Sequence, residues 1–166
     1  MLYEKKMASP LGELVLLASD QGIRAVLLGD FAETRSHSPE STVAKNHPLL
    51  KQCEKELQEY FSGKRKSFSV PLDPQGTPFQ KKVWSALMDI PYGKIESYSD
   101  QAKRMGTVKS VRAIAAANGR NLIAIIIPCH RVIAATGHLH GYAGGLSSKQ
   151  KLLEIEGLMI KDLRVT

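Results

Sequence analysis

Apolar runs separated by turn signals occupy the first third of the chain. Residues 11–19 and 23–28 are two such runs, and the short stretch 20–22 between them contains a glycine. Apolar runs joined in this way are typical of a β-hairpin. Residues 66–72 alternate polar and apolar side chains, which predicts a further strand before the Pro- and Gly-containing break at 73–76. The first third of the chain is therefore expected to form a small sheet.

A helix is predicted between these strands, over residues 49–61. Its apolar side chains recur at helical spacing, at Leu49, Leu50, Cys53, Leu57, Tyr60 and Phe61. Cys53 is accordingly expected in the core. The preceding stretch, residues 30–46, is polar and aperiodic and contains His37 and Pro39. We expect it to be a loop with solvated histidines.

A strong helix start follows the break. Thr77 is a good N-cap residue, Pro78 suits the first helical position, and Gln80 completes a capping box. The apolar stripe of this helix is expected to contain Phe79, Val83, Leu87 and Ile90. We expect a domain boundary here, with a small N-terminal domain over residues 1–76 and a second domain over residues 77–166.

Two further short helices are predicted with a tight turn between them. The first covers residues 98–105, with Ser97 as its cap, Asp100 completing a capping-box pattern and Gly106 as its stop. The second covers residues 108–118 and has high helix propensity. Two helices in this order within a basic region indicate a helix-turn-helix.

The second of these helices is mostly alanine and carries a single long cation, Arg112. Helices that read base edges in the major groove usually carry several polar side chains. A smooth helix suits close approach to a narrower groove, where one long cation can enter the base stack as a wedge. A buried packing helix with one solvated arginine is the alternative reading.

The chemically most informative stretch is Pro128-Cys129-His130-Arg131-Val132, which ends the apolar run 123–127. That run predicts a buried strand with the thiol at its rim. A cysteine is a good nucleophile as thiolate, a state that a neighbouring histidine favours. Cysteine is also among the most often buried residues, so a core role stays open from this segment alone.

Composition limits the class of protein, the use of its cysteines and the kind of partner it can bind. The chain has 166 residues with 43% hydrophobic content, no apolar stretch of membrane-spanning length and no signal-peptide pattern at its start, so we expect a cytoplasmic globular protein. Its two cysteines are too few for a disulfide scaffold or a cysteine-based zinc site. The net charge of +7 suits a polyanionic partner. The basic residues expected to share one site with the thiol are Lys94, Lys103, Arg104, Lys109, Arg112, Arg120 and Arg131.

Together these motifs resemble the O6-alkylguanine-DNA alkyltransferases. The resemblance also rests on Asn121, Ser97-Tyr98, Val111-Arg112-Ala113, Gly141-Tyr142-Ala143-Gly144-Gly145 and Glu156-Gly157. It implies a mixed α/β (α+β) fold. A small N-terminal ribonuclease H-like antiparallel sheet with a helix would precede a mostly helical C-terminal domain, in which a short strand leads to the active-site cysteine.

The resemblance implies direct DNA repair by a methylated-DNA–protein-cysteine methyltransferase. The alkyl group of O6-alkylguanine, and of O4-alkylthymine, would pass to Cys129 once, after the damaged base is flipped out through the minor groove. A thioether is not cleaved by water, so the protein would stay alkylated. The partner would be double-stranded DNA, with no membrane, no cofactor, no metal and a monomeric protein.

The resemblance also assigns roles residue by residue. Cys129 would be the nucleophile, His130 the base acting through a water, and Glu156 the residue that orients His130. Tyr98 would donate to the leaving guanine, and Asn121 would tie the helix-turn-helix to the turn of the nucleophile. Arg112 would fill the gap in the base stack. The further DNA contacts would be Tyr98, Ser99, Thr107, Ala113 and Ala135, and the substrate pocket would be formed by Val132, Tyr142 and Ala143.

Two other functions remain as alternatives at this point. A papain-like thiol hydrolase would use the same cysteine and histidine but would turn over on acyl substrates and would not need Arg112. A helix-turn-helix protein without transfer activity would bind DNA alone. The pair His138 and His140 has the spacing of metal ligands, but the sequence offers no third ligand, so we expect a loop near DNA.

Overall fold

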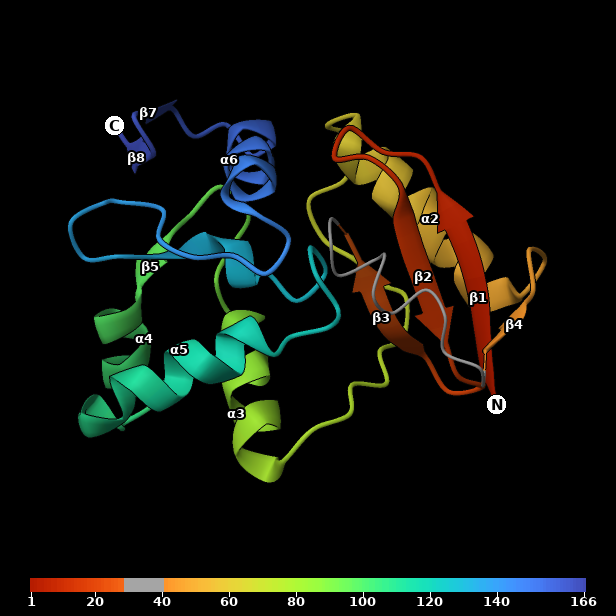
Figure 1. The fold of residues 1–166 in the computed structure, drawn as a ribbon, viewed down its shortest axis with the longest axis horizontal. Coiled ribbons are helices and arrows are strands. Elements are labelled where there is room, and N and C mark those ends of the chain that lie inside the picture. Colours follow the sequence, from red (N-terminus) through yellow and green to blue (C-terminus); the bar gives the residue numbers. More distant parts are fainter. Residues whose placement is uncertain (29–40) are drawn as a thin grey trace. The chain divides into compact units, whose positions relative to one another are not determined.

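The computed structural model describes residues 1–28 and 41–166. Contacts divide these residues into two compact units, Met1–Gln75 with Leu122–Ile126, and Gly76–Asn121 with Ile127–Thr166. The domain boundary expected after residue 76 stays a prediction, and Leu122–Ile126 groups with the first unit rather than the second. The fold is mixed α/β as expected, with a small sheet and a helix in the first unit and mainly helices in the second (Figure 1).

The first unit contains a four-stranded sheet in the order β3-β2-β1-β4. β2 (Leu14–Ala18) pairs antiparallel with both β1 (Leu2–Met7) and β3 (Ile23–Leu27). β4 (Ser41–Val43) lies parallel to β1. Every residue of β2 is buried, as fits a strand with a neighbour on each side. The predicted hairpin is confirmed by β2 and β3.

The sequence pattern did not predict β1 or β4. β1 carries Glu4, Lys5 and Lys6 in succession, so its side chains do not alternate between apolar and polar. β4 falls inside the stretch expected to be a loop, and that prediction is wrong at Ser41–Val43. The part of the expected loop with His37 and Pro39 lies outside the described residues.

α2 (Pro48–Phe61) is the helix predicted from the first apolar stripe, and it lies along one face of the sheet (Figure 1). The Nδ1 atom of His47 caps it by accepting a hydrogen bond from the Leu49 amide at 3.2 Å. The fully buried residues of the helix include Cys53, so its core position is confirmed. Burial raises the pKa of the Cys53 thiol to about 12, and this cysteine is therefore not a nucleophile near neutral pH.

Residues 66–72 do not form the predicted strand, and a single bridge joins Leu72 to β3. The buried carboxylate of Glu56 holds this segment instead. It accepts hydrogen bonds from the amides of Ser69 at 2.8 Å and Val70 at 3.1 Å, and from the Ser69 hydroxyl at 2.8 Å. The Glu56 carboxylate thus accepts the backbone hydrogen bonds that the carbonyls of a neighbouring strand would otherwise accept.

The second unit begins with α3 (Pro78–Leu87), which starts at the predicted capping box. The Thr77 hydroxyl accepts from the Gln80 amide at 3.1 Å, and the Gln80 side chain accepts from the Thr77 amide at 3.0 Å. Val83 and Leu87 are buried as expected. Phe79 is 37% exposed, so its assignment to the apolar stripe was wrong; the buried face is completed by Trp84 and Ala86. Ile90 is buried beyond the end of the helix.

The predicted helix pair is present. α4 (Tyr98–Arg104) is capped by Ser97, whose hydroxyl accepts from the Asp100 amide at 3.0 Å. A turn at Gly106, with φ of +73°, leads into a 3₁₀ turn, η1 (Val108–Ser110), and then α5 (Val111–Gly119). The buried amides of Gln101 and Asn118 exchange two hydrogen bonds of 3.2 and 2.8 Å. This reciprocal pair fixes α4 against α5.

The apolar run 123–127 is buried throughout, but it is not the expected strand. Ile123 makes one parallel bridge to Val26, and residues 124–126 then form a turn in which Ile125 has a φ of +74°. A run of apolar side chains indicates burial without specifying a backbone period, so a buried turn produces the same pattern as a buried strand.

The remaining elements belong to the second unit, which also contains the cysteine motif. β5 (Glu96–Ser97) pairs in parallel with β6 (Val132–Ile133), and α6 (Leu146–Ile155) is followed by the hairpin β7 (Ile160–Lys161) and β8 (Arg164–Val165). An apolar cluster of Ile133, Leu139 and Leu153 packs with residues of this hairpin. Across residues 1–28 and 41–166, no helix is both long and apolar enough to cross a lipid bilayer.

Candidate active site

Cys129 begins a one-turn 3₁₀ helix, η2 (Cys129–Arg131), that runs directly into β6. The Cys129 amide donates to the carbonyl of Ile127 at 2.8 Å, and the Arg131 amide donates to that of Pro128 at 3.1 Å. The thiol therefore sits on a tight turn rather than at the end of a strand. The pairing of β5 with β6 places Ser97 opposite Ile133, one residue before α4 begins at Tyr98.

The Cys129 thiol is half-buried and is held by Asn121. The side-chain amide of Asn121 donates to the Ile127 carbonyl at 2.9 Å and to the Cys129 sulfur at 3.3 Å. Burial raises the pKa of Cys129, although the Asn121 amide, the Lys149 ammonium and the Tyr142 hydroxyl each act to lower it. The resting sulfur is therefore a thiol, which needs a base before it can attack.

The next residue along the chain, His130, can supply that base. His130 is fully buried, and its Nε2 lies 2.6 Å from Oε2 of Glu156. Burial lowers the pKa of His130 and outweighs the opposing effect of Glu156. A neutral imidazole that donates from Nε2 leaves the lone pair on Nδ1, and within the described residues Nδ1 has no hydrogen-bond partner. Nδ1 can therefore accept a proton.

Arg131 balances the charge of Glu156. Its Nε donates to Oε1 at 2.8 Å and its Nη2 to Oε2 at 3.1 Å, while Nη1 donates to the Ile90 carbonyl at 2.7 Å. The amide of Gly93 donates to Oε1 at 3.0 Å. Gly93 has a φ of +76°, and a Cβ there would lie 3.2 Å from the Glu156 carbonyl oxygen, so glycine suits this approach.

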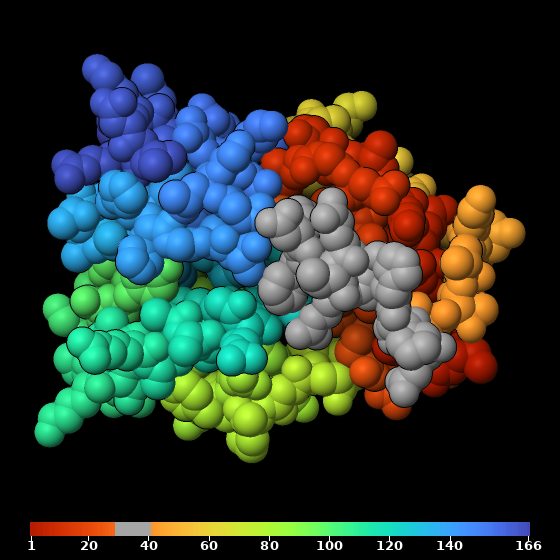
Figure 2. Space-filling view, viewed as in Figure 1, coloured from red at the N-terminus to blue at the C-terminus, as the bar shows by residue number. Residues whose placement is uncertain are grey.

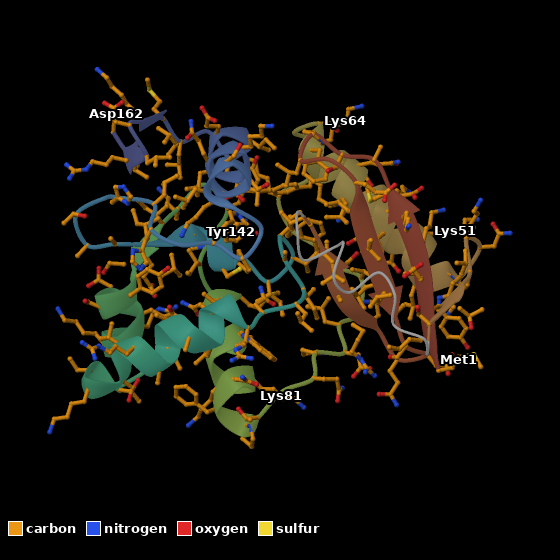
Figure 3. The ribbon with its side chains drawn as sticks, viewed as in Figure 1. Met1, Lys51, Lys64, Lys81, Tyr142 and Asp162 are labelled. Atoms are coloured by element: carbon orange, nitrogen blue, oxygen red, sulfur yellow. The ribbon has the colours of Figure 1, made fainter. Side chains whose placement is uncertain are left out.

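Two phenols border the thiol. Tyr98, the first residue of α4, is half-buried, and Tyr142 lies in the loop that leads into α6, where Figure 3 labels it. The Tyr142 hydroxyl is buried. Burial, followed by the charge of a Cys129 thiolate, raises the pKa of both Tyr98 and Tyr142. Both side chains are therefore proton and hydrogen-bond donors near neutral pH. Ala143, the next predicted pocket residue, is exposed.

Lys149 is a site residue that the sequence analysis missed. It lies on α6 and is fully buried, and its Nζ donates to the carbonyls of Val132 at 2.7 Å and Gly141 at 3.3 Å. Burial lowers its pKa to about 8, against the opposing effect of Cys129. The carbonyl of Val132, a residue expected in the substrate pocket, thus already accepts one hydrogen bond. A lysine within an ordinary helical pattern carries no sequence signal of burial.

The predicted DNA contacts are mostly accessible. Ser99, Arg112, Ala113 and Ala135 are exposed. Figure 2 shows α4, η1 and α5, coloured green to teal, at the surface of the second unit. Thr107 is half-buried, and its hydroxyl is buried without a hydrogen-bond partner among the residues described.

Comparisons with known proteins give the family. The DNA-binding domain model of 6-O-methylguanine DNA methyltransferase matches residues 78–158, and the ribonuclease-like domain model of the same enzyme matches residues 2–74. The chain belongs to the 6-O-methylguanine DNA methyltransferase family. Family membership makes it a DNA-repair methyltransferase whose acceptor is a cysteine, as the resemblance of its motifs implied.

Curated relatives cover almost the whole chain. The methylated-DNA–protein-cysteine methyltransferase of Methanosarcina acetivorans is 44% identical over 156 residues, which cover 94% of this chain and 99% of the relative. The constitutive methylated-DNA–protein-cysteine methyltransferase of Bacillus subtilis is 44% identical over 168 residues, with coverage of 98% and 99%.

Solved structures of relatives agree. The O6-methylguanine methyltransferase of Mycobacterium tuberculosis has a TM-score of 0.81 at 38% identity, covering 94% of this chain and 93% of that one. The structure of Mycobacterium tuberculosis OGT in complex with DNA has a TM-score of 0.83 at 39% identity, covering 93% and 92%.

One prediction about this methyltransferase needs correction. Seven basic residues were expected to share one site with the thiol; Arg131 does lie in that site, but it and Arg104 are paired with acidic side chains instead of being free cations. Arg131 is buried against Glu156. Arg104 donates to Glu96 at 2.9 Å and to the Ala86 carbonyl at 2.8 Å. Sequence position alone does not distinguish a solvated cation from one that satisfies a carboxylate.

His138 and His140, whose spacing would suit two metal ligands, form a hydrogen bond with each other in the structure. The Nδ1 atom of His138 accepts a hydrogen bond from the His140 amide at 3.2 Å. In residues 1–28 and 41–166, no three His, Cys, Asp or Glu side chains are grouped so that they could hold a metal ion.

Proposed function

We propose that this chain removes the alkyl group from O6 of guanine in double-stranded DNA by one transfer to the sulfur of Cys129. The observation that carries the proposal is the neutral, buried His130, which follows Cys129 in the chain, is tied to Glu156 through Nε2 and has no hydrogen-bond partner at Nδ1 among the described residues. This arrangement supports removal of the thiol proton at the moment of attack.

The proposed step balances without a cofactor. His130 takes the thiol proton through a water, the sulfur forms a bond to the alkyl carbon, and the bond from that carbon to O6 breaks. The departing guanine takes a proton from Tyr98, which His130 then reprotonates. The product at Cys129 is a thioether, which water does not cleave. Each protein molecule therefore acts once.

Recognition of the damaged base is proposed to use the helix pair. The Mycobacterium tuberculosis relative crystallised in complex with DNA supports a DNA complex for this chain. We propose that α5 lies along the minor groove and that Tyr98 crowds the phosphate backbone of the DNA. The exposed Arg112 then fills the gap left by the flipped nucleotide. The contacts from Ser99, Thr107, Ala113 and Ala135, and the pocket from Val132, Tyr142 and Ala143, belong to the same proposal.

The proposal also extends to O4-alkylthymine, since the alkyl–oxygen bond to be broken is of the same kind. It takes the protein to act as a monomer in the cytoplasm, where thiols stay reduced. A duplex with O4-methylthymine, added as a competitor to the guanine substrate, tests the wider specificity.

Labelled DNA gives the decisive test. The protein is incubated with a duplex that carries O6-methylguanine labelled in the methyl group, then digested and analysed by mass spectrometry. We expect one label per protein molecule, on the Cys129 peptide. Cys53→Ala should retain the transfer, since that thiol has a pKa of about 12, and Cys129→Ala should lose it. Label elsewhere, or more product than protein, overturns the proposal; turnover would favour a thiol hydrolase, and DNA binding without label would favour a simple binder.

The role of Arg112 has its own test. Arg112→Ala should slow transfer from duplex DNA about tenfold or more, because base extrusion costs a few kcal/mol. Transfer from free O6-benzylguanine should not change, since no base is flipped. Lys109→Ala removes another exposed cation nearby as a matched control. Equal losses on both substrates would contradict the assignment of Arg112.

A further inference from the structure

The residues just before the loop with Tyr142 and Ala143 are held both by apolar packing and by backbone hydrogen bonds. Leu139 is fully buried, in the cluster that includes Ile133 and Leu153. Its amide donates to the Leu163 carbonyl in the β7–β8 turn at 2.8 Å, and the His138 carbonyl accepts from the Ala134 amide at 2.9 Å. Asp162, labelled in Figure 3, lies in the same turn. The backbone that carries His140 is therefore fixed.

His140 itself has an unusual backbone. Its φ is +61°, in the left-handed region that residues other than glycine rarely adopt. The hydrogen bond from its amide to Nδ1 of His138 holds this conformation. A strained backbone that is held by its surroundings is often found next to a functional site. The side chain of His140 is exposed, so core packing does not account for the strain.

The ring of His140 meets the ring of Tyr98. Their centroids are 5.7 Å apart and their planes are at 75°, an edge-to-face pair. Tyr98 is the first residue of α4 and is half-buried. The left-handed backbone of His140 thus carries a ring that packs against the ring of the proposed proton donor.

We propose that His140 is a positioning residue for Tyr98, whose hydroxyl it holds in the direction required for donation to the leaving guanine. This inference rests on the proposed function, since it takes Tyr98 to donate in the transfer. It makes no use of a metal or of a charge on His140. The two histidines then have separate roles, which account for their H-x-H spacing: His138 fixes the backbone conformation of His140, and His140 supplies the ring.

His140→Asn is the most informative variant, because asparagine accepts the left-handed conformation but has no aromatic ring. The single-turnover rate on O6-methylguanine duplex is measured with protein in saturating excess, and the affinity for undamaged duplex is measured separately. We expect the rate to fall about two- to tenfold, the range typical of an aromatic pair, with unchanged DNA affinity and a melting temperature lowered by no more than about 5 °C.

A double-mutant cycle with Tyr98→Phe separates positioning from a general structural effect. Without the hydroxyl, the direction of the ring no longer affects donation, so His140→Asn should have no further effect on the rate in the Tyr98→Phe background. Independent, multiplicative losses would overturn the inference. His140→Phe, which keeps a ring, should recover most of the rate in the presence of Tyr98.

The outcomes are distinguishable from a failure of the proposed function. If the unaltered protein takes no label on Cys129, the proposed transfer itself fails. If it takes label and His140→Asn reacts at the same rate, only this inference fails. A variant with weaker DNA binding and an unchanged saturated rate would make His140 a direct DNA contact, and this result would also overturn it.

Discussion

Arg131, rather than His130, balances the negative charge of Glu156. The guanidinium donates to both carboxylate oxygens, and a paired carboxylate has less need of a charged imidazole. The positive charge of Arg131 also contributes to the lowered pKa of His130. Arg131, which was expected to share one site with the thiol, thus acts together with burial to keep the base of the site neutral.

Replacing Arg131 with methionine should raise the pKa of His130, because a positive neighbour is lost while the opposing effect of Glu156 remains. A larger fraction of His130 is then protonated at neutral pH and cannot accept the thiol proton. We expect slower transfer at neutral pH, partial recovery at higher pH, and a shift of the acid limb of the rate profile to higher pH. Single-turnover rates over a pH series measure this.

Arg131→Lys is the matched control for that experiment. It keeps a positive charge but not the bidentate hydrogen bonds to Glu156, so its pH profile should shift less than that of Arg131→Met. Breaking a buried pair costs about 3–5 kcal/mol, so circular dichroism must first show that each variant is folded. A folded methionine variant with an unchanged pH profile would contradict the assigned role of Arg131.

At the level of single residues, the sequence best predicted the functional side chains that lie within a recognisable motif. Asn121, Cys129, His130 and Glu156 were named from the sequence, and the structure brings them together. The burial of Lys149 and the internal pairing of Arg131 were not predicted. Both depend on carbonyls and carboxylates that lie far away along the chain, and local pattern does not report them.

At the level of elements, local signals gave the helix starts. Thr77 and Ser97 cap α3 and α4 as predicted, because a cap is an interaction within a few residues. The strands were less predictable. Residues 66–72 and 123–127 have strand-like patterns and form no strand, since pairing depends on which partner lies alongside. In the first case, Glu56 of α2 takes the place of a partner strand.

Glu56 should make the stability of the protein depend on acid pH. Hydrogen bonds from Gln52, Ser69 and Val70 lower its pKa in the folded protein against the opposing effect of burial. Its contribution is thus fully present above the unfolded value, about 4.5, and is lost as pH falls through the lower folded value. Urea unfolding over an acid pH series should show this loss in the unaltered protein and a flatter dependence in Glu56→Gln.

At neutral pH, Glu56→Gln should lower the free energy of unfolding by about 1–3 kcal/mol, because an amide cannot accept from all of these donors. Glu54→Gln on the same helix is the matched control. Glu54 pairs with Lys5 at 3.4 Å with a partly exposed side chain, so its loss should cost less than about 1 kcal/mol. Equal effects of the two substitutions would show that the segment 66–72 is not held by the Glu56 carboxylate.

For the whole molecule, the net charge of +7 says less about DNA binding than the distribution of free cations. Of the seven basic residues expected at the site, Arg104 and Arg131 are engaged with acidic side chains. The other five are exposed, and none of them has an ion-pair partner in the part of the chain that the structure describes. These five are Lys94, Lys103, Lys109, Arg112 and Arg120.

This distribution predicts the salt dependence of DNA binding. Each neutralised phosphate contributes about 0.9 to the slope of the logarithm of the binding constant against the logarithm of salt concentration. If all five free cations contact phosphates, the slope reaches about −4.5, whereas seven contacts would give about −6. Titration of an undamaged duplex at several salt concentrations measures the slope, and Lys109→Ala should make it shallower by about 0.9. A slope near zero would leave these cations without a role in DNA binding, and one near −6 would mean that cations outside this set also contact DNA.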